Sequence, residues 1–448
     1  MKALLKYEFK RVLYDKKNLY FFAIFLLVSL YFVNSGLNEF KRFQKDKTVF
    51  INHEKKRVDQ YSYYRQYSGY GFRVLFEPSP LNIFFNNSTV LFDIEGNVDT
   101  TQILKIYNLF KGKKLFYNRG YFKDFSGFVY FIGSLLMMYM GILGFRSINW
   151  LKFKLQFISF KKLFVMSTFI RLFYLNTFFI LVMALAFAYA VINKLSFSGT
   201  EVWHYFSYTL FTLMMLNFFY FIGLLLAILL KFKKTSFIWM LLLWFSFTFL
   251  VPEINRLYLF EDVKVLPSNE DIDFEKMELL MDFQNKVMQR IETIKDDEEE
   301  LEKLYIASVK DYLENVHLLI KNQEALLSKK IKNTIYYYEK QNLLFPTMFY
   351  YFLSAEISSK GYYGYLAFKN YLVVTAEAFL RFFLDKQYIQ RDQGKKVENF
   401  VKKDENIFKA RSHFPQTFWQ GIGITFFYCL LFLVAAYISL KRRVYPND

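Results

Sequence analysis

Residues 1–33, MKALLKYEFKRVLYDKKNLYFFAIFLLVSLYFV, join a basic, patterned stretch directly to an apolar one. The basic part extends to Lys17 and includes acidic residues, which is long for the positive region of a signal peptide, and no small-residue cleavage site follows the apolar part. Apolar side chains recur in it at the spacing of a helix that lies in the headgroup layer with its cations toward phosphates. The stretch therefore predicts a retained interfacial helix over residues 1–17 and a first transmembrane helix over 18–34, rather than a cleaved signal peptide. The residues that define this interfacial helix are Leu5, Phe9, Arg11 and Leu13.

Five further apolar stretches follow, each close to the 17–25 residues with which a helix crosses the hydrocarbon core. With 448 residues, 54% of them hydrophobic and 22% aromatic, the chain is too apolar and too segmented for one soluble domain. We predict an all-α membrane protein with six transmembrane helices. The later five are expected at residues 125–146, 165–193, 205–231, 235–252 and 417–440.

The net charge of +18 is distributed as in a membrane protein and argues against a nucleic-acid partner. Lysine and arginine gather before the first span, between the second and third, between the fourth and fifth, and in the tail at 441–448. The short loop between the third and fourth spans carries only Lys194 and Glu201. Because positive charge in short loops marks the cytoplasmic side, we expect both termini in the cytoplasm.

Two long segments then lie outside the cytoplasm, at residues 35–124 and 253–416. In the first, a charged helical stretch is followed by the prolines of Pro78-Ser79-Pro80, after which short extended pieces are expected. The second lacks glycine and proline from 268 to 345, which predicts two or more long helices, with a hairpin turn near 296–300. The acidic run at that turn fits a solvated surface, and a cation site is the alternative.

Few residues of this chain suggest chemistry. Cys429 is the only cysteine and the four histidines are scattered, so neither a disulfide nor a metal-ligand spacing is present. The sequence also lacks a G-x-x-x-x-G-K-[ST] phosphate loop. Within the spans, charges are nearly absent, and Arg171 is expected to reach the cytoplasmic surface, which disfavours an ion-coupled secondary transporter. We expect no enzyme activity, cofactor or metal in this chain.

The loop between the second and third spans, residues 147–164, is basic and amphipathic. Read as a helix, it gathers Trp150, Phe153, Phe157 and Phe160 on one side, although the alternation from 151 to 157 also permits a strand. Such a segment docks in a groove on a partner protein or rests on anionic lipid.

An interfacial entry helix, six spans and an amphipathic segment after the second span together resemble the permease subunits of ABC-2-type transporters. The stretch PSPLNIF at 78–84 is similar to a P-x-P-L-S-I-like stretch of a subfamily with enlarged outer domains, near the gliding-motility-associated permeases. Residues 345–361, from FP to SSKG, and then Phe368, resemble that subfamily's segment between spans five and six. The chain departs from the family at 146–149, where RSIN replaces a Glu and a Gly-Thr-Leu run.

The resemblance implies a membrane-spanning subunit that exports its substrate and pairs with a second, identical or different, permease. Aromatic-rich spans without buried charge suit a lipidic or amphiphilic substrate. ATP and Mg²⁺ would be bound by a separate ATPase subunit, onto which the segment after span two docks. The residues that the resemblance assigns to this docking are Trp150, Phe153, Lys154, Phe157, Ile158 and Phe160. The alternative is a membrane-anchored interaction or scaffold protein that acts through its outer helical domain.

Overall fold

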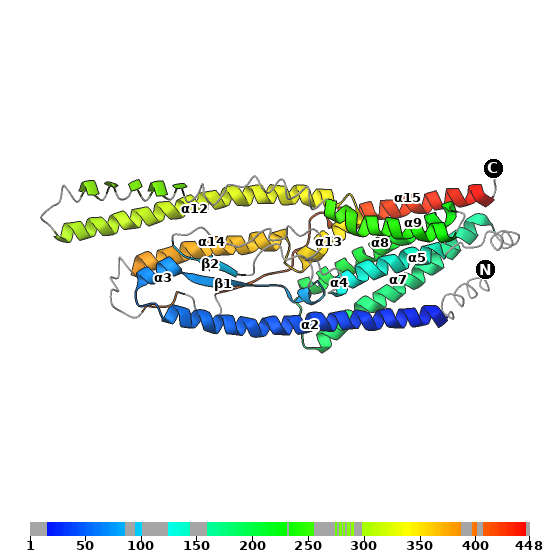
Figure 1. Cartoon of the computed structure of the whole chain (residues 1–448), viewed down its shortest axis with the longest axis horizontal. Coiled ribbons are helices and arrows are strands. Elements are labelled where there is room, and N and C mark those ends of the chain that lie inside the picture. The colour runs from blue at the N-terminus through cyan, green and yellow to red at the C-terminus, as the bar shows by residue number, and fades with distance from the viewer. Residues whose placement is uncertain are drawn as a thin grey trace.

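A computed structural model places six apolar helices side by side in one bundle (Figure 1). It describes residues 16–85, 95–100, 124–143, 159–230, 233–254, 274–275, 277–279, 281–282, 285–286, 288–290, 298–386, 397–400 and 406–444. Each of the six is long and apolar enough to cross a membrane, which confirms the prediction of a multi-pass membrane protein. The apolar segments are Leu19–Asp59, Phe125–Ile142, Phe160–Ile192, Gly199–Leu229, Thr235–Ile254 and Phe418–Val444.

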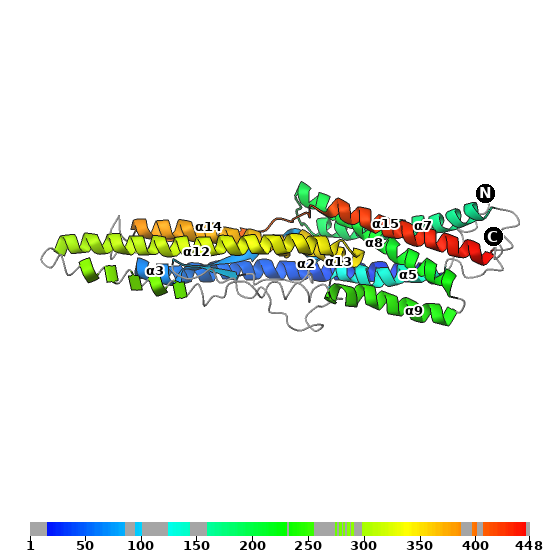
Figure 2. The same ribbon diagram turned by 90° about the horizontal axis from the view of Figure 1, so that it is seen from above.

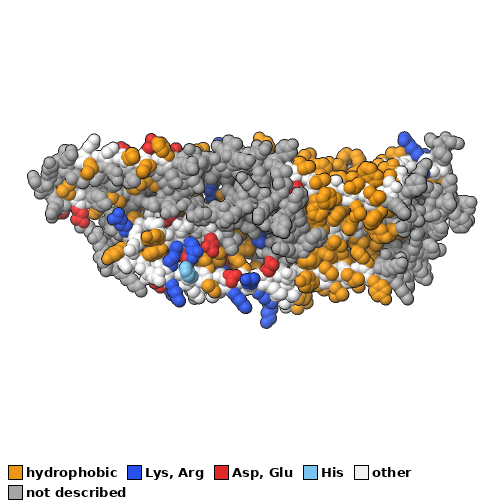
Figure 3. All heavy atoms as spheres, viewed as in Figure 1, with side chains coloured by type: hydrophobic (Ala, Val, Ile, Leu, Met, Phe, Trp, Pro, Cys, Tyr) orange, Lys and Arg blue, Asp and Glu red, His pale blue; other side chains and the backbone are white. Residues whose placement is uncertain are grey.

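The second and fourth of these segments form the centre of the bundle. The second is built from α4 (Phe125–Phe128), the π-helical turn η2 (Val129–Gly133) and α5 (Ser134–Ile142), and the fourth is α8 (Gly199–Leu229). Around them stand α2, α7, α15, and α9 with its π-helical turn η3. Their outward faces are apolar, and Figure 3 shows an uncharged hydrophobic band over this part of the molecule. The bounds of the surrounding elements are Lys16–Asp59 (α2), Phe160–Ile192 (α7), Lys233–Phe245 (α9), Ser246–Leu250 (η3) and Phe418–Val444 (α15).

Two glycines allow α5 and α8 to approach at backbone distance. A Cβ added at Gly223 would lie 2.0 Å from the carbonyl oxygen of Met138, and one added at Gly141 would lie 2.2 Å from that of Tyr220. Small residues at a crossing are the usual way in which membrane helices gain van der Waals contact, because lipid provides no hydrophobic drive to pair them.

We call the end of the bundle where α2 begins and α15 ends the inner end, and the opposite end the outer end.

Helix α2 does not stop at the membrane. It runs unbroken from Lys16 to Asp59, 44 residues or about 66 Å, so the boundary expected at residue 34 is not a break in the helix. Figure 1 shows it along one side of both the bundle and the domain beyond it. It touches the loop after β1 closely at Gly36, where a Cβ would lie 2.0 Å from the carbonyl oxygen of Ile83.

The two outer segments of the chain share one small sheet. Strand β1 (Phe72–Glu77) pairs antiparallel with β2 (Glu95–Val98) and parallel with β3 (Ile407–Lys409), in the order β2-β1-β3. The described residues are mostly helical, as predicted, but the sequence analysis did not predict this sheet. Strand β1 also precedes the two prolines, whereas extended structure was expected only after them.

Helices surround this sheet and extend beyond it. The helices α3 (Tyr64–Tyr70) and α14 (Tyr362–Leu384) pack beside it. Helix α12 (Glu298–Asn342), which is 45 residues or about 68 Å long, runs alongside the 23-residue α14 and beyond it. Short helical pieces between 274 and 290 accompany the outer part of α12 (Figures 1 and 2). Together these elements, the outer half of α2 and the sheet form the outer domain. The hairpin turn predicted near 296–300 falls partly outside the described residues.

Candidate functional site: a buried polar junction at the outer end of the bundle

The PSPLNIF stretch connects the outer domain to the start of α8. Ser79 is fully buried, and its backbone N–H donates to Oγ of Ser359 at 2.8 Å while its own Oγ donates to Oε1 of Glu201 at 2.6 Å. Pro80 occupies the first turn of the 3-10 helix η1 (Pro80–Ile83), where a missing N–H is tolerated. Glu201 also closes a capping box with Ser198 at the start of α8. The Glu201 carboxylate therefore hydrogen-bonds both to the first turn of α8 and to the loop that carries Ser79.

The SSKG stretch forms the sharp turn between α13 (Pro346–Ile357) and α14. Ser359 takes a φ of 62°, and a Cβ at Gly361 would lie 2.2 Å from Oε1 of Glu356. The space left by this glycine lets the Glu356 carboxyl reach the start of α14, where it accepts hydrogen bonds from the backbone N–H groups of Tyr362 (2.8 Å) and Tyr363 (3.2 Å). Complete burial raises the pKa of Glu356 from its usual value of about 4.5 to about 8, and the nearby charge of Glu339 adds to this effect.

Glu339, near the end of α12, joins two further segments. Its Oε1 accepts hydrogen bonds from the backbone N–H (3.0 Å) and the hydroxyl (2.5 Å) of Thr417, just before α15, and its Oε2 accepts one from the Tyr363 hydroxyl at 2.9 Å. His413 stacks on the Tyr363 ring at 3.9 Å and donates its backbone N–H to the carbonyl oxygen of Glu356. Burial lowers the pKa of the His413 imidazole. These contacts tie α12, α14 and α15 together at one level.

Lys360 brings a positive charge into the same region. It is 7% exposed, and burial lowers its pKa to about 8, although the negative charges of Asp124 and Glu39 act in the opposite direction. Asp124 caps α4 by accepting the N–H of Gly127 at 2.6 Å, and Glu39 belongs to α2. The two carboxylates therefore offset part of the cost of burying this charge.

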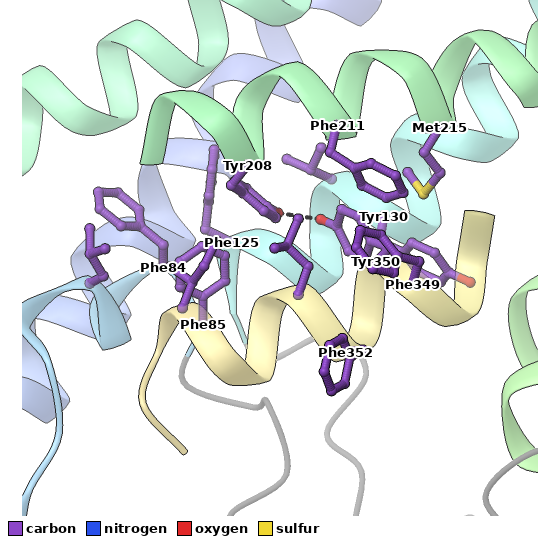
Figure 4. Close-up of a cluster of buried hydrophobic side chains, with 14 of the residues drawn as sticks. Phe84, Phe85, Phe125, Tyr130, Tyr208, Phe211, Met215, Phe349, Tyr350 and Phe352 are labelled. Carbon is purple, nitrogen blue, oxygen red and sulfur yellow. Dashed lines mark hydrogen bonds between the residues drawn. The ribbon is translucent and has the colours of Figure 1, made fainter. Parts of the chain in front are cut away.

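Hydroxyl groups continue the junction into the bundle, as Figure 4 shows. The Tyr208 and Tyr350 hydroxyls lie within hydrogen-bond distance of each other and of Ser126: the Tyr208 hydroxyl is 2.9 Å from its Oγ, and the Tyr350 hydroxyl is 2.9 Å from its carbonyl oxygen. These residues come from α8, α13 and α4. Aromatic rings from the same helices close around the hydroxyls, which are buried.

We define the junction as Ser79, Asp124, Glu201, Glu339, Glu356, Ser359, Lys360 and His413. Its polar groups serve mainly as partners for one another, which suits mechanical connection better than chemistry on a substrate. Within the described part of the chain, no group of three or more His, Cys, Asp or Glu side chains has a metal-binding arrangement. The junction instead links α2, α4, α8, α12, α13, α14 and α15.

The residues predicted to dock an ATPase are mostly outside the described ranges. Phe160 is the exception: it is the first residue of α7, is 8% exposed, and packs against Phe164 and against Tyr437 of α15. The others, Trp150, Phe153, Lys154, Phe157 and Ile158, lie outside the described residues, as do Leu5, Phe9, Arg11 and Leu13 of the expected interfacial helix.

The PSPLNIF and SSKG stretches are recognisable in the sequence, but their contact is not. A local sign of the junction is nevertheless present in the sequence, because the charged residues Glu356 and Lys360 stand in an otherwise apolar and aromatic run. Comparisons of the chain with protein-family models, with characterised proteins and with solved structures returned no match. The function is therefore inferred from the architecture, the junction and the sequence resemblance.

Proposed function

We propose that this chain is the membrane-spanning permease subunit of an ATP-driven ABC-2-type transporter. Six spans that begin and end at the same end of the bundle, with an enlarged domain at the other end, agree with the architecture that the sequence resemblance implies. ATP and Mg²⁺ would be bound by a separate ATPase subunit, and two permeases, identical or different, would face each other in the membrane.

The charges favour an inner end in the cytoplasm of a bacterial cell, with the chain in the inner membrane. Lys161, Lys162, Lys441 and Arg442 are exposed there, and within the described residues of that end there is no aspartate or glutamate. The acidic residues that are described lie on the outer domain or at the outer ends of the helices. This asymmetry follows the positive-inside rule.

The observation that carries the proposal is the continuity from one end of the molecule to the other. At the inner end, Phe160 packs on Tyr437, and Arg443 donates to the carbonyl oxygen of Ile228 at 2.6 Å, which joins α7 and α15 to the end of α8. At the outer end, the junction joins α8 to the outer domain, and α2 enters that domain without a break. A displacement imposed by an ATPase would therefore reach the outer domain.

The direction of transport rests on the family precedent, and the class of substrate rests on the composition of the spans. The family precedent is export toward the outer side. The helices of the bundle are rich in aromatic and aliphatic side chains, which suits a lipidic or amphiphilic substrate, and lipid-facing positions favour the same residues.

The docking segment provides the sharpest test. Phe153→Asp and Phe157→Asp place a charge on the face predicted to enter the ATPase, so the co-purified ATPase should be lost and its stimulated activity should fall to the basal rate. Gln156→Asp adds the same charge on another face of the segment and should change neither. Unchanged co-purification in both Phe variants would refute the docking face.

The second candidate is a membrane-anchored interaction or scaffold protein. It is favoured by the length of α12, which extends beyond α14 in Figures 1 and 2 and offers a long outer surface to a partner. A chain that purifies with envelope proteins and without any nucleotide-binding subunit would support this candidate.

A further inference from the structure

The chain turns sharply between α12 and α13, and this turn lies inside the outer end of the bundle. We call residues 343–346 the corner. The carbonyl oxygen of Leu344 accepts a hydrogen bond at 3.0 Å from the hydroxyl of Tyr428, which follows the start of α15 at Phe418 by 10 residues, about 15 Å. Helical side chains lean toward the N-terminus of their helix, so the corner lies somewhat less deep than the backbone of Tyr428.

A second contact gives the depth of the corner independently. The ring of Phe345 lies beside that of Phe247 on η3, with 6.2 Å between the ring centroids. Phe247 precedes the outer end of the fifth apolar segment, at Ile254, by 7 residues, about 10 Å. Just beyond the corner, the ring of Phe349 on α13 contacts that of Phe211 on α8. The corner is therefore about 10 Å inward of the outer ends of the spans that it contacts.

Exposed tryptophans indicate where the membrane surface lies at this end. Trp203, near the start of α8, and Trp419, the second residue of α15, are both exposed. Tryptophan side chains are enriched at the headgroup level of a bilayer. Because the corner contacts Tyr428, nine residues farther along α15 than Trp419, it lies on the hydrocarbon side of this level.

One side chain of the corner points away from the protein. Leu344 is 58% exposed, whereas its neighbour Leu343 is buried. An exposed leucine at this depth in a membrane-spanning bundle has acyl chains beside it, because no water is present in the hydrocarbon layer.

The last two turns of α12 carry side chains that suit the headgroup layer. Tyr336 and Tyr337 are exposed and precede Leu344 by about two turns. The Nζ atom of Lys340 lies 4.4 Å from the centroid of the Tyr336 ring, which is one turn farther from the corner. The ammonium group is therefore directed outward, as it is in a lysine that snorkels from hydrocarbon to the interface.

We infer that the corner and the last two turns of α12 enter the lipid leaflet at the outer end of the bundle, with Leu344 among the acyl chains and the two tyrosines and Lys340 among the headgroups. An apolar face combined with aromatic and cationic side chains is the composition by which interfacial helices bind a membrane surface. The outer domain is then attached to the membrane at a second place, besides the continuous helix α2. This inference rests on the six spans and not on the proposed transport function.

The test uses the full-length chain in lipid nanodiscs with a single fluorescent label. Cys429→Ala removes the only native thiol, and Leu344→Cys then takes a thiol-reactive, environment-sensitive fluorophore. A nitroxide on the acyl chain of phosphatidylcholine should quench this label as strongly as it quenches one at Phe426→Cys, an exposed position on α15. Iodide in the buffer should quench neither label.

Lys332→Cys is the matched control on α12, because it is exposed and lies 12 residues, about 18 Å, outward of Leu344. Its label should be quenched by iodide and not by the nitroxide. The inference is overturned if the Leu344→Cys label behaves like the Lys332→Cys label. It is overturned as well if neither quencher reaches the Leu344→Cys label, because a protein surface, such as that of a second copy of the chain, would then cover the corner.

A charge substitution gives a second measurement that needs no label. Leu344→Asp should lower the melting temperature in nanodiscs by about 2–4 °C, because an aspartate is costly in hydrocarbon. Leu326→Asp makes the same change farther out on α12, at a position that is 56% exposed, and should leave the melting temperature unchanged. Equal melting temperatures for the wild type and Leu344→Asp would contradict the inference.

Discussion

The buried carboxyl of Glu356 makes the stability of the outer domain depend on pH, and Glu356→Gln should remove that dependence. The pKa of this carboxyl is raised to about 8 in the folded chain, whereas its ordinary value is about 4.5. A group whose folded pKa is raised contributes fully at a pH below the ordinary value, and that contribution is lost as the pH rises toward 8. With about 1.4 kcal/mol for each pKa unit, the wild type should lose about 5 kcal/mol of unfolding free energy across this window.

Glutamine keeps the shape but cannot ionise. Its amide nitrogen cannot accept an N–H, so one of the two hydrogen bonds to the start of α14 is lost, at a cost of about 1 kcal/mol. The variant should therefore be slightly less stable than the wild type at pH 5 and clearly more stable at pH 8.5.

The assay is the melting temperature of the purified chain between pH 5 and pH 8.5 in neutral detergent. For a chain of this size we expect the wild type to lose on the order of 5–10 °C across the range from this carboxyl, and Glu356→Gln to lose much less. Glu299→Gln, at an exposed position on α12, is the control and should follow the wild type. Identical pH profiles for the wild type and Glu356→Gln would refute the reasoning.

Other variants test the close contacts of the fold. Gly36→Ala drives a methyl group into backbone and should destabilise the chain by several kcal/mol, measured as the melting temperature, whereas Gly69→Ala has open space and should be neutral or slightly stabilising. Gly223→Ala should separate the two central helices and lower the yield of monodisperse protein in size-exclusion chromatography, while Gly423→Ala, also in open space, should not. Ser79→Ala removes a hydrogen bond to a buried carboxylate and should cost about 1.5–3 kcal/mol of unfolding free energy in denaturant titrations.

The six spans could be predicted because their signal is local. Each is a run of apolar residues about as long as the hydrocarbon core is thick, and nothing distant is needed to recognise it. The continuity of α2 was harder to predict, because the charged stretch after Val33 differs in composition from the span although no proline interrupts it. A charged helical stretch was expected after the span, and the structure shows that span and stretch are one helix.

The sheet and the junction depend on contacts between distant parts of the chain. Strand β3 has three residues, and its partner β1 lies more than 300 positions away, so neither shows a periodicity that identifies the pair. Likewise, nothing local shows that Glu339 is buried or that it lies near Glu356, since their shared environment is created by α12, α14 and α15 together. The residues of the junction became recognisable only when the fold placed the two quoted motifs in contact.

The most direct test of the central claim is purification of the tagged chain from its native locus in mild detergent, followed by identification and quantification of what accompanies it. We expect a nucleotide-binding ATPase in a one-to-one ratio with the permease, with ATP hydrolysis that depends on Phe153 and Phe157. Recovery of the chain without any ATPase, in association with envelope proteins, would contradict it.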